Sequence, residues 1–271
     1  REFDPDTIIA THFLGAEVFG PLRRKGRLRA TLSIVITDFE MHSVWAAEKA
    51  DMYFAGNEAV SCGLAARGVS GRISVSGIPI MAAFAETPRG RSDLRAKLGM
   101  RLDAAAIMVS AGGFGMMPMD EAVSLIVDCA PGAQVLAVAG RNEKLRLALE
   151  ALARKREGSV IPLGFVNNMH ELMAASDLAV TKSGGLTSSE CLAMGLPMVI
   201  WNPIPGQEER NADYLLESGA AVRANSPAHL AFKVRKLLAN ADVLTRMSAA
   251  AKAIARPHAA VDIAREVMSA Q

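Results

Sequence analysis

The stretch from Thr181 to Tyr214, TKSGGLTSSECLAMGLPMVIWNPIPGQEERNADY, constrains this chain more than any other segment. It begins where a short apolar run gives way to a loop of small residues, Ser183 to Gly185, and continues as a predicted helix that stops at Gly195. A glycine loop between a strand and a helix N-terminus offers free backbone N–H groups and a partial charge of roughly +0.5 to an anion. The stretch therefore predicts a phosphate-binding site.

Polar side chains follow this loop at two positions where a nucleotide sugar would need them. Glu190 lies a few residues into the helix and suits ribose hydroxyls, because hydrogen bonds to a charged acceptor are worth roughly 1.5–3 kcal/mol. After the next apolar run, Pro197–Trp201, the polar cluster Gln207, Glu208 and Asn211 suits the hydroxyls of a sugar. The segment as a whole predicts a nucleotide-sugar site.

The composition is that of a globular protein with room for two domains: 271 residues, 51% hydrophobic and 21% charged. A net charge of +2 does not require nucleic acid as a partner. No apolar run reaches about eighteen residues and no signal peptide is visible, so we expect a cytoplasmic protein that does not span the membrane. The widely spaced Cys62, Cys129 and Cys191 fit reduced thiols and show no metal-ligand spacing.

A cluster of basic residues precedes the second candidate strand. One interpretation is a solvated loop between a helix and a strand. The other is attraction to an anionic membrane surface, at about 1 kcal/mol per basic residue. The cluster consists of Arg23, Arg24, Lys25, Arg27 and Arg29.

Apolar runs alternate with helical periods along the chain. Near-continuous apolar strands separated by amphipathic helices are typical of parallel sheets covered on both faces, so the predicted fold class is α/β. The candidate strands are Thr7–Thr11, Leu32–Ile36, Met52–Ala55, Ile73–Ser76, Ile107–Ala111, Gln134–Ala139, Val160–Gly164, Leu178–Thr181, Met198–Trp201 and Ala220–Val222. Three helical stretches close the chain, Pro227–Leu238, Asp242–Ala253 and Ala259–Met268.

Two segments interrupt this alternation. Gly77–Arg91 is rich in Pro, Gly and Ala and predicts a seam between domains. The break at Arg256–Pro257 would let the last helix leave the preceding domain. Because the chain opens with Arg1 and soon enters an apolar run typical of an interior strand, we expect a fragment, or a chain whose beginning is missing.

Two further loops follow candidate strands. The loop Ala111–Met117, AGGFGMM, lacks GxGxxG spacing, and the next strand leads into Gly140-Arg141-Asn142 without the acidic residue of a dinucleotide site. A second phosphate-facing loop fits better, with a tight turn as the alternative. Gly164–Met169, GFVNNM, could present backbone groups to a base edge, or serve as a turn and N-cap.

Three residues near the start of the chain are candidates for acid–base chemistry. Asp38 and His42 cluster at the carboxyl end of a strand, where open α/β sheets place ligands, and His12 follows the first strand in the same way. The alternative is that they act as caps and turn residues. The sequence leaves both interpretations open.

With these residues in view, the chain resembles glycosyltransferase family 28. It looks most like the processive diacylglycerol glycosyltransferases and monogalactosyldiacylglycerol synthases, and next like the N-acetylglucosaminyltransferases that form lipid II. The matching segments are Thr37–Asp38, Gly77–Pro79, Gly112–Pro118, Ala139–Asn142, Gly164–Met169, Lys182–Pro197 and Gly206–Asn211.

The resemblance implies a GT-B fold with a complete, Rossmann-like C-terminal domain and a partly present N-terminal one. Residues 1–80 would be the remnant of the acceptor domain, residues 81–255 the UDP-sugar-binding domain, and residues 256–271 a helix crossing back. Uracil, ribose, diphosphate and sugar would then meet successive parts of the second domain. The implied donor-binding residues are Gly112, Gly113, Arg141, Phe165, Val166, Ser183, Gly184, Gly185, Leu186, Thr187, Glu190, Gln207, Glu208 and Asn211.

The resemblance also implies an activity: inverting, metal-independent transfer of galactose or glucose from a UDP-sugar to diacylglycerol. Such an enzyme of glycolipid biosynthesis would sit peripherally at the inner face of the cell membrane. It would need no cofactor, because the UDP-sugar is a substrate. The family's acceptor loop and catalytic base would lie upstream of Arg1, so we expect poor activity from this chain alone, with His12, Asp38 and His42 as candidate bases.

Three other functions remain open at this stage. The first is an N-acetylglucosaminyltransferase acting on a polyprenyl-linked acceptor. The second is a UDP-sugar epimerase, which shares the fold. The third is a donor-binding module that needs a partner chain for activity.

Overall fold

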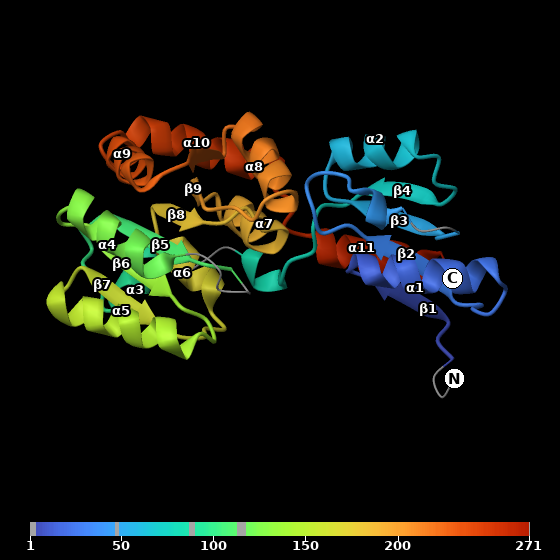
Figure 1. The fold of residues 1–271 in the computed structure, drawn as a ribbon, viewed down its shortest axis with the longest axis horizontal. Helices are drawn as coiled ribbons and strands as arrows, with labels where there is room; N and C mark the ends of the chain where they lie inside the picture. Colours follow the sequence, from blue (N-terminus) through green and yellow to red (C-terminus); the bar gives the residue numbers. More distant parts are fainter. Residues whose placement is uncertain (1–3, 47–48, 87–89, 113–117, 271) are drawn as a thin grey trace. The chain divides into compact units, whose positions relative to one another are not determined.

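The computed structural model describes residues 4–46, 49–86, 90–112 and 118–270. The chain divides into two compact units, the first formed by Arg1–Ala82 with Arg256–Gln271 and the second by Ala83–Ala255 (Figure 1). Each contains one parallel sheet, so the expected α/β class with two such sheets is confirmed. No helix in the described part of the chain is both long and apolar enough to cross a bilayer.

The first unit is built on a four-stranded sheet in the order β1-β2-β3-β4. Alternate residues of each strand point to opposite faces, and both faces are covered. Ile34 and Tyr53 pack on one side with the cluster that includes Ala16 and Leu64. The elements are β1 (Thr7–Ala10), α1 (Phe13–Arg24), β2 (Thr31–Val35), η1 (Ser43–Trp45), β3 (Met52–Ala55), α2 (Glu58–Ala66) and β4 (Arg72–Val75). The short helix η2 (Ala82–Phe84) spans the boundary between the two units in the sequence.

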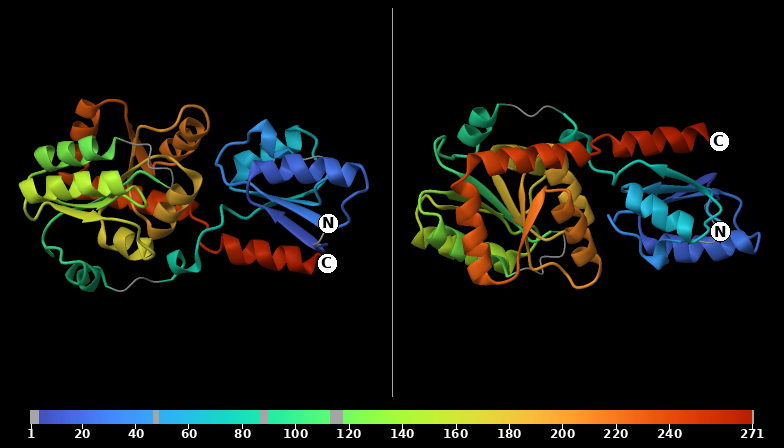
Figure 2. Two further views of the ribbon diagram at one scale, coloured as in Figure 1. Left: turned by 60° about the horizontal axis from the view of Figure 1, so that its bottom comes forward. Right: turned by 90° about the horizontal axis from the view of Figure 1, so that it is seen from above.

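The last helix, α11 (Ala259–Ser269), belongs to this first unit rather than to the segment that precedes it. Ile263 and Val267 of α11 form a cluster with Val35, Met52 and Phe54. Figure 2 shows α11 on the side of the sheet opposite α1 and α2. The apolar period of the last predicted helix is thus used to cover the second face of this sheet.

The second unit holds a six-stranded parallel sheet in the order β10-β9-β8-β5-β6-β7. This is the doubly wound order, in which the chain first moves outward from β5 in one direction and then in the other. The strands are β5 (Ala106–Ser110), β6 (Gln134–Val138), β7 (Val160–Leu163), β8 (Leu178–Thr181), β9 (Met198–Trp201) and β10 (Ala221–Ala224).

Helices cover both faces of this sheet as well. Val123 of α4, Leu149 of α5 and Val234 of α9 lie in the main core cluster. The alternate strand residues Met108 and Ala179 are fully buried on the other side. The helices are α3 (Arg91–Lys97), α4 (Met119–Cys129), α5 (Glu143–Lys155), α6 (Met169–Ala175), α7 (Gly185–Met194), α8 (Gln207–Glu217), α9 (Pro227–Leu238) and α10 (Ala241–Ile254).

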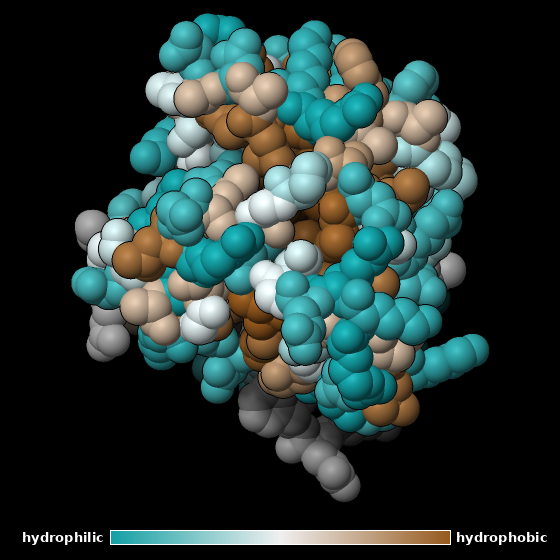
Figure 3. Space-filling model, turned by 90° about the vertical axis from the view of Figure 1, so that its left-hand side faces the viewer, coloured by the Kyte–Doolittle hydropathy of each residue, from teal (hydrophilic) through white to brown (hydrophobic). Residues whose placement is uncertain are grey.

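One face of the second unit carries mainly hydrophilic side chains. Figure 3 looks onto the side where α4, α5 and α9 lie in Figure 1, and apolar side chains show there mostly in the hollows between hydrophilic ones. This is the surface expected of helices whose apolar stripe faces a sheet.

All ten strands predicted from apolar runs are present in the described residues, with shifts of one or two positions at their ends. The three closing helices are present too, and α9 has the predicted bounds. The predicted stop of α7 at Gly195 is also confirmed: Gly195 has φ +62°, its N–H donates to Leu192 and that of Leu196 to Cys191. Glycine accepts this left-handed backbone at no steric cost.

Candidate nucleotide-binding site

The doubly wound order fixes where a ligand of the second unit would bind. The chain reverses direction between β5 and β8, which are neighbours in the sheet. Ligands of such sheets bind beyond the carboxyl ends of the strands at this reversal. Ser110 ends β5 and leads to Gly112, while Thr181 ends β8 and leads to Ser183 and the glycine pair. Both predicted phosphate loops therefore start at this point.

A pocket of about 560 Å³ opens here. It gathers the ends of β5, β6 and β7 with the first turn of α7, segments that are far apart in the sequence. Five of the expected donor-binding residues, Gly112, Arg141, Phe165, Val166 and Thr187, line it together. The remaining lining residues are Ser110, Val138, Ala139, Gly140, Asn142 and Met169.

One wall of the pocket is the beginning of α7. Gly184 is the N-cap and has no side chain with which to cap the helix. The first turn holds no acidic residue, and Leu186 is 53% exposed. An uncapped first turn keeps its backbone N–H groups and the positive end of the helix dipole available to an anion.

Glu190 lies in the second turn of α7. Burial raises the pKa of its carboxyl group to about 7. Within the described residues the structure gives it no hydrogen-bond or ion-pair partner, so nothing offsets that penalty. Glu190 is not among the residues that line the 560 Å³ pocket, but Thr187, one turn earlier on α7, is, and a strongly perturbed carboxyl group without a partner is a candidate ligand-binding residue.

The lining of the pocket also includes a cation on an aromatic ring. The guanidinium carbon of Arg141 lies 4.9 Å from the ring centroid of Phe165, and Phe165 is 66% exposed. Asn142 caps α5 by accepting a hydrogen bond from the N–H of Leu145 at 3.0 Å. The loop Gly140–Asn142 thus combines the side-chain amide of Asn142, which caps α5, with the positive charge of Arg141 in the pocket lining.

The predicted sugar-binding cluster at the start of α8 contacts the second glycine loop, Ser183–Gly185, through Glu208. Ser183 is fully buried and its hydroxyl donates to the carbonyl of Glu208. Lys182 Nζ lies 3.0 Å from Glu208 Oε1 in an ion pair whose side chains are 4% and 14% exposed. Gln207 is exposed and Asn211 is buried. These three residues of α8, Gln207, Glu208 and Asn211, do not line the 560 Å³ pocket.

Lys182 is a residue that the sequence analysis did not single out. A signal was present, since Lys182 directly follows the buried strand LAVT, and a buried lysine needs a partner. The partner, Glu208, is 26 residues away in the chain, so no local spacing reveals the pair. Gly113, which was expected to bind the donor, lies outside the described residues.

In the first unit the three candidate bases are engaged in local structure. His12 Nδ1 accepts a hydrogen bond from the N–H of Leu14 at 3.2 Å, and His42 Nδ1 accepts one from Val44 at 3.3 Å. Asp38 is 2% exposed and accepts a hydrogen bond from the indole of Trp45 at 3.0 Å. Both histidines are N-caps, which was one of the two interpretations left open.

A metal site does not emerge in the described part of the chain: no three His, Cys, Asp or Glu side chains there gather into a group that could hold an ion. The three cysteines are free. The polar groups that line the pocket are backbone groups and the side chains of Arg141, Asn142 and Thr187, a set that suits an anionic ligand with hydroxyl groups.

Comparison with known proteins gives two family matches. The model of monogalactosyldiacylglycerol (MGDG) synthase matches residues 1–80, and that of glycosyl transferases group 1 matches residues 121–254. A processive diacylglycerol beta-glucosyltransferase of Bacillus subtilis is 33% identical over 250 residues. That alignment covers 91% of this chain, and this chain spans 64% of the relative's length.

Solved structures share the fold at low identity. The UDP-GlcNAc 2-epimerase from Neisseria meningitidis, bound to UDP-GlcNAc, has a TM-score of 0.74 at 13% identity, over 99% of this chain and 77% of its own. MurG of Acinetobacter baumannii has a TM-score of 0.69 at 17% identity, over 97% and 73%.

The solved structures show that the chain has a GT-B-like fold, and both family models that match it are models of glycosyltransferases. The resemblance to glycosyltransferase family 28 is confirmed, and within it the chain is related to the processive diacylglycerol glucosyltransferases and to monogalactosyldiacylglycerol synthase.

Proposed function

We propose that this protein is a UDP-sugar-dependent hexosyltransferase that transfers glucose or galactose to diacylglycerol. The observation that carries the proposal is the pocket at the reversal of the second sheet, where an uncapped helix start and Arg141 line one cavity. The relatives named for diacylglycerol glucosyl transfer support the acceptor.

The donor would lie across the second unit in four parts. Uracil would meet the backbone at Phe165 and Val166, and the ribose hydroxyls would donate to Glu190. The diphosphate would meet the start of α7 from Ser183 to Thr187, and the hexose would extend toward the loop before α8. Helix N–H groups aimed at the diphosphate would stabilise the charge that develops as UDP leaves.

The acceptor half of the reaction needs a base. In an inverting transfer the base takes the proton of the lipid hydroxyl, whose oxygen then attacks the anomeric carbon as the bond to UDP breaks on the other side. His12 and His42 each use Nδ1 as a cap acceptor, so their neutral rings carry the proton on Nε2 and present a donor to solvent. Either ring would have to release its cap before acting as the base.

One alternative keeps a specific observation in its favour. The UDP-GlcNAc 2-epimerase from Neisseria meningitidis shares the fold and is bound to UDP-GlcNAc, so an N-acetylglucosaminyl donor with a polyprenyl-linked acceptor is the second candidate. A donor-binding module without transferase activity is the third.

A donor panel tests the proposal. Calorimetry with UDP-glucose, UDP-galactose and UDP-N-acetylglucosamine should show tighter binding of a UDP-hexose, and radiolabelled hexose should appear in glycolipid when diacylglycerol is supplied. Preference for UDP-N-acetylglucosamine would favour the second candidate. Binding without any glycolipid from the complete protein would favour the module.

We also propose that the protein works peripherally at the inner face of the cell membrane, through α1 of the first unit. Leu14 and Val18 lie one turn apart on α1 and are 54% and 55% exposed. The basic side chains that follow, Lys25, Arg27 and Arg29, are exposed. Arg23 is not part of this surface, because it binds Asp51 and the carbonyl of Ala30.

Removing this charge should weaken membrane binding. At about 1 kcal/mol per basic residue, the triple change of Lys25, Arg27 and Arg29 to Gln should lower partitioning onto anionic vesicles by about two orders of magnitude. Vesicle sedimentation measures the effect. The matched control changes Lys144, Arg154 and Lys155 of α5, three exposed basic residues of the second unit. Equal losses in the two variants would contradict a surface on α1.

A further inference from the structure

Three polar contacts at Glu208, in the first turn of α8, hold that turn, the preceding loop Asn202–Gly206 and the second glycine loop Ser183–Gly185 together. Glu208 accepts a hydrogen bond from Lys182 through Oε1, and from the N–H of Ile204 at 2.7 Å through Oε2. Ser183 donates to the main-chain carbonyl of Glu208. Asn202 and Gly206, at the two ends of this loop, have φ +51° and +92°, so its path is a tight and specific one.

Lys182 also lies against the first glycine loop. A Cβ atom built on Gly112 would lie 3.7 Å from Lys182 Cε, and one built on Gly184 would lie 3.8 Å from Glu208 Oε1. The lysine stem therefore lies close to Gly112, and its ammonium group binds the carboxylate of Glu208 close to Gly184. One buried side chain connects the two phosphate loops with the loop before α8.

An ion pair at this depth is energetically sensitive. Both partners lose most of their hydration, and their mutual attraction together with the hydrogen bond from Ile204 offsets that loss. If one partner is removed, the other is left as an uncompensated buried charge, and the first turn of α8, which carries Glu208, would have to rearrange to hydrate it.

We propose that Lys182 is a positioning residue for the donor sugar: it fixes Glu208 and the loop before α8 before the donor arrives. This inference rests on the proposed function. It assigns the orientation of the sugar-binding residues at the start of α8 to Lys182, which follows β8, rather than to the loop before α8 itself. Glu208 then serves the hexose as a carboxylate already held at both oxygens, which lowers the ordering cost of binding.

The test separates the hexose from the nucleotide. In Lys182→Met, affinity for the UDP-hexose should fall about tenfold, which corresponds to the cost of ordering one or two side chains, about 1.4 kcal/mol. Affinity for UDP should change by less than about twofold, a factor that corresponds to about 0.4 kcal/mol. Calorimetry of each ligand, with circular dichroism to confirm folding, gives both numbers.

A second single variant and a double-mutant cycle complete the test. Glu208→Gln has nearly the same shape and should give the same selective loss, and the double variant should lose less than the sum of the two single losses, because the pair acts as a unit. Glu209→Gln is the matched control on the next position of α8. Its ion pair with Arg223 is more exposed, at 29% and 44%, and Gln keeps an acceptor for the N–H of Gly206, which Glu209 Oε2 caps at 3.3 Å, so both affinities should remain unchanged.

Each result has one meaning. Equal loss of UDP and UDP-hexose affinity in Lys182→Met would overturn the proposal, because it would place Lys182 in contact with the diphosphate. Additive losses in the double variant would overturn it as well. If the unaltered chain binds neither ligand, the proposed function itself fails, and that is visible before any variant is made.

Discussion

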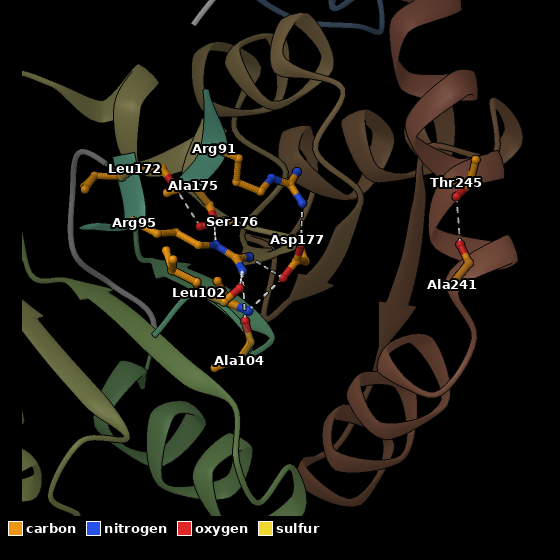
Figure 4. A network of polar contacts seen from close by, with 11 residues as sticks. Arg91, Arg95, Leu102, Ala104, Leu172, Ala175, Ser176, Asp177, Ala241 and Thr245 are labelled. Atoms are coloured by element: carbon orange, nitrogen blue, oxygen red, sulfur yellow. Dashed lines mark hydrogen bonds and ion pairs between the residues drawn. The ribbon is translucent and has the colours of Figure 1, made fainter. Parts of the chain in front are cut away.

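Replacing Asp177 by Ala should lower the free energy of unfolding of the second unit by about 3–5 kcal/mol, the range for removing one partner of a buried ion pair. Asp177 Oδ2 lies 2.8 Å from Arg95 Nη2 and 2.8 Å from the N–H of Ala106, and its Oδ1 lies 2.5 Å from Arg91 Nη1 (Figure 4). The Arg95 side chain is only 7% exposed. Without Asp177 its charge would have no carboxylate partner in the described surroundings.

The remaining partners of Arg95 explain why the loss would be large. Its other N–H groups donate to the carbonyls of Ala175, Leu102 and Ala104 at 2.9, 3.1 and 3.0 Å. This arrangement holds the guanidinium in place, so it cannot move to water when Asp177 is gone. The Arg95–Asp177 pair also ties the beginnings of β5 and β8 together, and the far ends of these two strands carry the two glycine loops.

Denaturant unfolding followed by tryptophan fluorescence measures this effect. Trp45 lies in the first unit and Trp201 in the second, so a Trp45→Phe background lets Trp201 alone report on the unit in question. Lys97→Ala is the control, because the Lys97 side chain is 51% exposed in its pair with Glu171 and should be worth less than about 1 kcal/mol. A loss below 1 kcal/mol in Asp177→Ala would show that Arg95 finds water or another acceptor.

The sequence predicts the architecture of this chain well because its strands are apolar on both faces. β5 (AIMVS) and β8 (LAVT) are buried along their whole length, and an apolar run of this kind between helical periods has few other interpretations. Gly195 marks the end of α7 for an equally local reason, the left-handed backbone. Both signals lie within a few residues, where pattern and propensity act.

The parts that the sequence does not predict are pairs of distant residues. Arg95 and Asp177 are separated by 82 positions, and Lys182 and Glu208 by 26. Nothing in either local pattern shows that these charges meet. His12 and His42 illustrate the reverse case, because a histidine after a strand is equally compatible with catalysis and with capping, and only the contacts to Leu14 and Val44 identify the cap.

The ionised carboxylate of Glu190 should lower the stability of the folded chain and raise its affinity for the donor. Burial raises its pKa in the folded chain to about 7, from about 4.5 in the unfolded chain. Between these values the folded state binds more protons, so its stability should fall as pH rises from about 4.5 to 7 and then level off. Glu190→Gln stays neutral and should therefore be more stable than the unaltered chain at pH 8, by up to about 3 kcal/mol.

The affinity for the donor should change with pH in the opposite direction to the stability. Ribose hydroxyls would donate to the ionised carboxylate, so affinity for a UDP-hexose should increase as pH rises through about 7, and Glu190→Ala should lose about 1.5–3 kcal/mol of it at pH 8. Using the UDP-hexose avoids the titration of the terminal phosphate of UDP. Calorimetry at pH 6 and pH 8, beside denaturation at pH 5 and pH 8, measures both effects on the same proteins.

The combination identifies the role of this carboxyl group. A residue that is merely buried in α7 would show the gain in stability in Glu190→Gln with no change in affinity. A residue that binds ribose shows the gain in stability together with loss of affinity, and the pH dependence of binding disappears in Glu190→Gln. Unchanged affinity in Glu190→Ala would remove Glu190 from the donor site, and the ribose would then have to be held by another part of the pocket.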